Sequence, residues 1–170
     1  ADADSEAVRA GLRPILIQAT SEEAELAAIV SRILDVVDDV TIGFGDIAVA
    51  AATNPLADKA VAALKQAGVP VQLLQNYDGL PSAAVKVGTH HRIKGLEFKQ
   101  VYLPFLSARK FPVIPAGVKD ADERREHEER SLSQLFVALT RARDQLFVTC
   151  TGDPADAIFG ALDQFELRHK

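Results

Sequence analysis

The chain has no methionine and no tryptophan, and only one cysteine among its 170 residues. A lone cysteine cannot form an internal disulfide, so we expect a reducing compartment, the cytoplasm. Cys150 lies in an apolar run, where its simplest role is that of a small buried side chain. Because the chain has no initiator methionine, we expect it to be a piece of a longer polypeptide.

Long hydrophobic runs are also absent. No apolar stretch approaches the ~20 residues that cross a bilayer, and no signal peptide opens the chain, so we expect no membrane partner. The formal net charge of −5 argues against a protein that coats nucleic acid non-specifically, but it allows a local basic groove. A hydrophobic fraction of 48% and a charged fraction of 25% are those of an ordinary globular protein.

Several motifs of known chemistry are missing. The chain contains neither a GxxxxGK[ST] phosphate loop nor a GxGxxG turn, so by itself it has no recognisable cradle for a nucleotide's phosphates. It has no GxSxG elbow of a serine hydrolase either. The spacing of His90, His91 and His127 fits no common ligand pattern, and we therefore predict no metal site.

Short apolar runs alternate with amphipathic segments along the chain. The runs predict strands at 14–20, 46–52, 69–74, 85–89, 101–106 and 146–152. The amphipathic segments predict helices at 21–37, 55–68, 123–145 and 153–170. Residues 1–13 are polar and are expected to be flexible, whereas 14–170 are expected to form one domain. This alternation predicts an α/β fold with a mostly parallel sheet and helices on both faces.

Polar residues follow several of the predicted strands. They include Thr53–Asn54, the segment Thr89–Glu97 and the loop after Leu106. Ligands of parallel α/β sheets bind beyond the carboxyl ends of the strands. We therefore expect these segments to converge on one edge of the sheet.

The segment THHRIKGLEF, residues 89–98, gathers groups that suit a binding site. Thr89, His91, Arg92 and Lys94 carry donors that suit phosphodiester oxygens, although a solvated loop would have the same composition. A carboxylate repels phosphate, so Glu97 is expected to face a sugar hydroxyl or a cation.

The segment VALTRAR places two arginines, Arg141 and Arg143, at the end of the predicted helix 123–145. Cations at that position interact favourably with the helix dipole. An arginine there is equally suited to reach a phosphate on a neighbouring domain, because its planar fork is permanently charged. The spacing alone favours neither role.

Taken together, these stretches resemble the superfamily 1 DNA helicases of the UvrD/Rep/PcrA kind. TxHxxKGLEF at 89–98 matches their motif V, and LFVALTRAR followed by LFVT matches their motif VI. IAVAAATN…LKQAGVPV and the KFP at 110–112 are also similar to segments of that family. The resemblance covers about residues 14–152.

The resemblance implies two RecA-like domains with ATP between them. The first domain carries the phosphate loop, the magnesium carboxylate and the catalytic glutamate, so it holds most of the ATP and Mg²⁺. This chain resembles the second RecA-like domain, which lacks a phosphate loop. The implied partners are the first domain of the same parent chain and single-stranded or partly duplex DNA. The implied activity is ATP-driven 3′ to 5′ movement, and the chain alone is expected to be inactive.

Roles at the nucleotide follow from the matched motifs. The resemblance implies that Arg141 is an arginine finger on the γ-phosphate, which makes it the catalytic candidate. It implies that Glu97 bonds the ribose hydroxyl and that Gly95 allows close approach of the backbone to the nucleotide. Lys94 is implied as a further nucleotide contact.

Roles at the DNA follow in the same way. The resemblance implies that Thr89, His91 and Arg92 hold the single-stranded backbone and that Thr53 and Asn54 line the same track. One short segment would thus touch ATP on one side and DNA on the other, coupling hydrolysis to strand movement.

The chain departs from the family pattern at three places. Ala52 stands where the family usually has arginine, and ERSLSQLFVA lacks the usual paired arginines. Only about ten residues, Gln75 to Ala84, occupy the position where many members insert an accessory domain. The insertion is either naturally absent or removed. Two other functions remain open, namely an ATP-driven remodeller like the HelD partner of RNA polymerase and a non-catalytic RecA-like interaction module.

Overall fold

We describe the fold from a computed structural model, which covers residues 12–38 and 41–170. Most of the segment 1–13, expected to be flexible, lies outside these residues. Arg13 belongs to the described part, and its guanidinium donates to the carbonyl oxygens of Asp163 and Phe165. No helix of the described part is long and apolar enough to cross a membrane.

Within the described residues, seven strands form one sheet in the order β3-β4-β2-β5-β6-β1-β7, and every neighbouring pair is parallel. The strands are β1 Ile15–Ala19, β2 Ile47–Ala51, β3 Val71–Leu73, β4 Val85–Thr89, β5 Phe98–Leu103, β6 Ala142–Thr151 and β7 Glu166–His169. The helices are α2 Glu22–Val37, α3 Asn54–Gln66, α4 Ala121–Leu139 and α5 Asp156–Phe159. The predicted α/β fold with a parallel sheet is confirmed.

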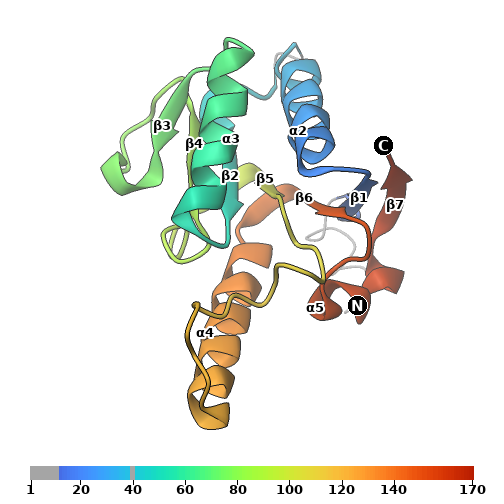
Figure 1. Ribbon diagram of the computed structural model, residues 1–170. Helices are drawn as coiled ribbons and strands as arrows, with labels where there is room; N and C mark the ends of the chain where they lie inside the picture. Colours follow the sequence, from blue (N-terminus) through green and yellow to red (C-terminus); the bar gives the residue numbers. More distant parts are fainter. Residues whose placement is uncertain (1–11, 39–40) are drawn as a thin grey trace, which may run out of the picture.

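Helices cover both faces of the sheet, as the sequence predicts (Figure 1). On one face, α2 and α3 pack on the side chains of β1, β2 and β6 and bury residues such as Ile29, Ile33 and Leu64. On the other face, α4 and α5 contribute Leu135 and Ile158 to a second core. Strands buried from both sides explain the continuous apolar runs of the sequence.

The helix ends are set by local chemistry that the sequence predicts. Ser21 caps α2, and its hydroxyl oxygen accepts a hydrogen bond from the Ala24 amide at 3.0 Å. Pro55 lies in the first turn of α3, where its missing amide hydrogen costs nothing. Gly68 follows α3 with a φ of 79°, a conformation that favours glycine.

The end of the chain differs from the sequence prediction. Instead of one helix over 153–170, the short helix α5 is followed by β7, which pairs with β1 in register Ile15↔Glu166. The Glu166 amide donates to the Pro14 carbonyl at 2.8 Å, and the Lys170 amide donates to the Gln18 carbonyl at 2.9 Å. Pairing with the exposed edge of β1 satisfies backbone groups on both strands, and this outweighs the local helical pattern.

The predicted helix 123–145 also ends too late. In the structure α4 ends at Leu139, with Thr140 as its C-cap, and β6 begins at Ala142. Ala142 pairs with Phe98, so β5 starts three residues before its predicted start at Val101. Long-range pairing between these two strand starts sets both boundaries, and it involves a partner far away in sequence.

The short connection Gln75–Ala84 is packed on the sheet edge by the buried Lys86. The Lys86 ammonium donates to the Ser82 hydroxyl at 2.8 Å, to the Ser82 carbonyl at 3.2 Å and to the Ala84 carbonyl at 3.0 Å. It also lies 5.1 Å from the centre of the Tyr77 ring. Burial lowers the pKa of Lys86, and the nearby Asp46 opposes that shift. These contacts hold the connection against the sheet.

Candidate functional site

The turn that follows β4 runs from the carboxyl ends of the parallel strands to their amino ends. We call these two sides of the sheet the carboxyl edge and the amino edge. The turn leaves β4 at its carboxyl end, where the His90 amide donates to the Ala51 carbonyl of β2 at 2.9 Å. It enters β5 at the amino end of that strand, beginning with Phe98. Ile93, in the middle of the turn, is fully buried and anchors it to the core. A single turn therefore presents residues to both edges of the sheet.

The candidate DNA-binding residues lie together at the carboxyl edge. They are Thr53 and Asn54 after β2, and Thr89, His91 and Arg92 at the end of β4. The two strands are neighbours, and Ala51 pairs with Thr89. Asn54, His91 and Arg92 are exposed.

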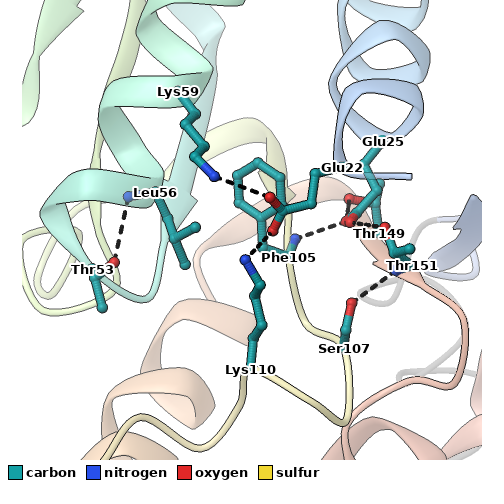
Figure 2. A network of polar contacts seen from close by, with 10 residues as sticks. All are labelled: Glu22, Glu25, Thr53, Leu56, Lys59, Phe105, Ser107, Lys110, Thr149 and Thr151. Carbon is teal, nitrogen blue, oxygen red and sulfur yellow. Dashed lines mark hydrogen bonds and ion pairs between the residues drawn. The ribbon is translucent and has the colours of Figure 1, made fainter. Parts of the chain in front are cut away.

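The two threonines of this group already accept hydrogen bonds from their own turns. The Thr53 hydroxyl oxygen accepts from the Leu56 amide at 3.4 Å (Figure 2), and that of Thr89 accepts from the Arg92 amide at 3.3 Å. A hydroxyl that accepts keeps its own hydrogen to donate. Both threonines are thus oriented donors at the edge.

Glu97 lies at the other edge, so the expectation that the whole segment Thr89–Glu97 shares one edge is wrong. The reason is that the turn crosses the sheet within a few residues. At the amino edge, Glu97 is adjacent to Arg141, because the Phe98 amide donates to the Arg141 carbonyl at 3.0 Å. Within residues 12–38 and 41–170, neither side chain takes part in an ion pair.

Arg141 lies beyond the helix end, not within its last turn. Its Nη2 and Nε donate to the Thr140 hydroxyl oxygen at 2.9 and 3.3 Å, and that hydroxyl donates to the Val137 carbonyl at 2.8 Å. The guanidinium is partly exposed. Arg143 lies within β6, exposed, and is no part of the helix. Arg141 therefore stays at the C-terminal end of α4, whereas Arg143 does not.

Lys94 and Gly95 lie in the exposed part of the turn. Gly95 has a φ of 81°, which side chains rarely adopt, while the space around it is open. Its backbone conformation, and no close contact of the described chain, accounts for glycine at this position. The Lys94 amide donates to the His91 carbonyl at 3.4 Å, which closes the turn.

His90 has a structural environment unlike that of its neighbour His91. It is buried, its ring centre lies 6.2 Å from that of Phe111, and its Nε2 has no hydrogen-bond partner. Burial lowers the pKa of His90 to about 4, against a hydrogen bond to Ala50 that raises it. The imidazole is neutral at physiological pH and cannot attract a phosphate. In the described ranges, no three or more His, Cys, Asp or Glu residues gather to hold a metal.

Sequence reasoning missed a buried glutamate beside the carboxyl edge. Glu25 of α2 accepts hydrogen bonds from the Phe105 amide at 2.9 Å, the Thr149 hydroxyl at 2.7 Å and the Thr151 hydroxyl at 2.6 Å (Figure 2). Phe105 has a φ of 66°, which turns its amide toward the carboxylate. Burial raises the pKa of Glu25, although all three hydrogen bonds lower it. The signal was available, because Glu25 shares a helix face with the buried Ile29 and Ile33.

Comparison with known proteins finds a likeness to one family. The profile of the UvrD-like helicase C-terminal domain matches residues 75–153, a little under half of the chain. The matched part includes the turn after β4, the whole of α4 and Arg141. No curated protein sequence matches the chain.

Two solved structures have a similar fold. One is the C-terminal domain of a possible DNA helicase from Lactobacillus plantarum WCFS1, at 18% identity and a TM-score of 0.67, covering 94% of this chain and 86% of that one. Another is the C-terminal domain of the DEAD-box protein Dbp5, at 13% identity and a TM-score of 0.52, covering 95% of this chain and 91% of that one. At such identities the likeness shows the RecA-like fold alone.

Proposed function

We propose that this chain is the second motor domain of an ATP-dependent DNA helicase or translocase that moves 3′ to 5′. The observation that carries the proposal is the turn after β4, which joins a cluster of phosphate donors at one edge to the Glu97–Arg141 pair at the other. A motor needs such a connection, because hydrolysis at one site must move a ligand at another.

At the amino edge, Arg141 is the proposed arginine finger. Its charge is permanent, no acid of the described chain neutralises it, and Thr140 restricts its orientation. The chain has no phosphate loop, so the first RecA-like domain holds the triphosphate and Mg²⁺, and Arg141 reaches the γ-phosphate from across the interface. Lys94 and the exposed backbone at Gly95 approach the same nucleotide.

At the carboxyl edge, the side chains of five residues are proposed to bind the DNA backbone. They are the oriented hydroxyls of Thr53 and Thr89, the Asn54 amide, the His91 imidazole and the Arg92 guanidinium. Contacts of this kind position a DNA strand but do not read its base sequence. Ile93 packs the middle of the turn into the core, so both ends of the turn move with the domain as one body. A shift of the domain at the nucleotide edge would thereby move the DNA contacts at the other edge.

The role of Glu97 is tested with nucleotide analogues. We expect Glu97→Ala in the full-length parent to raise the KM for ATP about tenfold, the loss of one charge-assisted hydrogen bond. The KM for an ATP analogue that lacks the bonded ribose hydroxyl should hardly change. The measurement is steady-state hydrolysis of ATP, 2′-deoxyATP and 3′-deoxyATP by wild type and variant.

The matched control for this experiment is Glu126→Ala, which removes an exposed carboxylate from α4. It should leave all three KM values unchanged. An equal rise of KM for ATP and both deoxy analogues in Glu97→Ala would show that Glu97 does not recognise the ribose.

A further inference from the structure

A cavity of about 660 Å³ opens at the carboxyl ends of β5, β6 and β1. Its lining includes Thr20 after β1, Ser107–Lys110 after β5, and Gly152 and Asp153 after β6. In the sheet, β5, β6 and β1 follow directly after β4 and β2. The cavity is therefore on the same edge as the proposed DNA contacts, but none of those contacts lines it.

The topology of the sheet explains why a cavity forms here. After β6 the chain passes to α5 on one face of the sheet, and after β1 it passes to α2 on the other face (Figure 1). Adjacent parallel strands whose connections diverge in this way leave a crevice beyond their carboxyl ends. Open α/β sheets commonly bind ligands in such crevices.

Cations gather around this cavity. Arg109 is exposed and has no side-chain partner among the described residues. Lys110 lies 2.6 Å from one carboxylate oxygen of Glu22, and Lys59 of α3 lies 3.0 Å from the other (Figure 2). The hydrogen bond from Lys110 is the largest cause of the lowered pKa of Glu22. Glu22, which lines the cavity, thus pairs with Lys110 of the lining and with Lys59, which lies outside it.

Two carboxylates, Glu22 and Asp153, also line the cavity. Glu22 is already neutralised by two lysines, and Arg109 brings a further positive charge to the lining that includes Asp153. Both lysine side chains are about half exposed, at 51% for Lys59 and 45% for Lys110, so an arriving anion competes with Glu22 at little cost. The Thr20 side chain, exposed at the end of β1, supplies a hydroxyl donor.

The distance suits a continuous nucleic-acid strand. From β2 to β1 there are three strand spacings, or about 14 Å at the usual separation of neighbouring strands. A nucleic-acid strand places a phosphate about every 3.4 Å along a B-form axis and less densely when stretched. A few nucleotides beyond those at Thr53 and Asn54 therefore reach the cavity.

We propose that this cavity binds backbone phosphates of the same single strand, with Arg109 and Lys110 as the contacts. On binding, Lys110 exchanges the Glu22 carboxylate for a phosphate, and Lys59 keeps Glu22 paired. The inference rests on the proposed function. It extends the DNA track from the carboxyl ends of β4 and β2 to those of β5, β6 and β1.

The test measures binding of fluorescent oligothymidylate to the 170-residue chain by anisotropy at several salt concentrations. A short oligomer covers only the ends of β4 and β2, and a longer one reaches the cavity. The two test variants are Arg109→Ala/Lys110→Ala and His91→Ala/Arg92→Ala. The control is Lys65→Ala, in the last turn of α3 and away from the end of that helix at Asn54. A further variant, Glu22→Gln, weakens the competitor and is expected to tighten binding of the longer oligomer.

We expect the Arg109→Ala/Lys110→Ala variant to weaken binding of the longer oligomer about tenfold and to reduce its salt slope by about 0.7 for each cation lost. Its affinity for the short oligomer should not change, and Lys65→Ala should bind both like wild type. If His91→Ala/Arg92→Ala weakens binding but Arg109→Ala/Lys110→Ala does not, the cavity is no part of the track. If neither double variant changes the affinity, the proposed DNA-binding edge itself is contradicted.

Discussion

Replacing Arg141 with alanine is expected to lower DNA-stimulated ATP hydrolysis by the full-length parent about 10³–10⁵-fold, the usual worth of an arginine finger. The guanidinium stabilises charge that develops on the transferred phosphoryl group, so the loss should appear in kcat. ATP binding should persist, because the phosphate loop belongs to the other domain. The measurement combines steady-state hydrolysis with binding of a fluorescent ATP analogue.

Arg143→Ala is the matched control, because it removes the same charge two residues further on, from an exposed position in β6. It should change kcat by no more than a few-fold. Arg141→Lys should also be severely impaired, since an ammonium keeps the charge but not the planar fork. A wild-type rate for Arg141→Ala would show that this residue only follows the end of α4.

Glu25→Ala is expected to lower the free energy of unfolding of this chain by about 3 kcal/mol, because it leaves two buried donors and one partly buried donor without an acceptor. For a domain of this size, that corresponds to a melting temperature lower by roughly 10 °C. Urea denaturation followed by circular dichroism measures the change. Glu25→Gln keeps an acceptor oxygen and the side-chain volume, so it should cost much less than Glu25→Ala.

The same pair of proteins, wild type and Glu25→Gln, tests the electrostatics. Burial raises the pKa of Glu25 above its ordinary value, so the folded state binds this proton more tightly than the unfolded state. The stability that Glu25 contributes is therefore full below the ordinary carboxyl pKa and is lost as pH rises through the raised folded pKa. Wild type should lose stability relative to Glu25→Gln across that window. A difference that is constant with pH, or of opposite sign, would contradict this assignment.

The parallel sheet was predictable because strands buried on both faces leave continuous apolar runs, as in Ile47–Ala51. The strand Glu166–His169 was not predictable in the same way. It is short, polar and at the sheet edge, and it exists because β1 offers it a partner from the other end of the chain. Local pattern carries no information about such a partner.

Motif spacing proposes the residues of the candidate site, but it does not give their geometry. Motif spacing indicated Glu97 and Arg141, but their adjacency follows from the pairing of Phe98 with Ala142, which depends on the folded sheet. The path of the turn after β4 could not be predicted either. The sequence shows where a strand ends, but not how soon the chain then crosses to the opposite edge. Glu25 was overlooked because acidic residues in a first helical turn usually only favour the dipole.

Ala52, directly after β2, brings no charge to the proposed DNA track. It is partly buried and packs against the core. If the carboxyl edge binds DNA, the cations must come from elsewhere on it. Arg92, Arg109 and Lys110 are exposed cations in the described part of that edge.

The central claim is that the two edges of this domain serve different ligands, nucleotide at the amino edge and DNA at the carboxyl edge. The most direct measurement is the rate of ATP hydrolysis by the full-length parent as a function of single-stranded DNA concentration, for Arg141→Ala and His91→Ala/Arg92→Ala beside wild type. We predict that Arg141→Ala lowers the plateau and leaves the half-saturating DNA concentration unchanged. His91→Ala/Arg92→Ala should raise the half-saturating concentration and leave the plateau close to that of wild type. Two results would contradict the division of the domain into a nucleotide edge and a DNA edge. In one, both variants change the same parameter. In the other, Arg141→Ala raises the half-saturating concentration and His91→Ala/Arg92→Ala lowers the plateau.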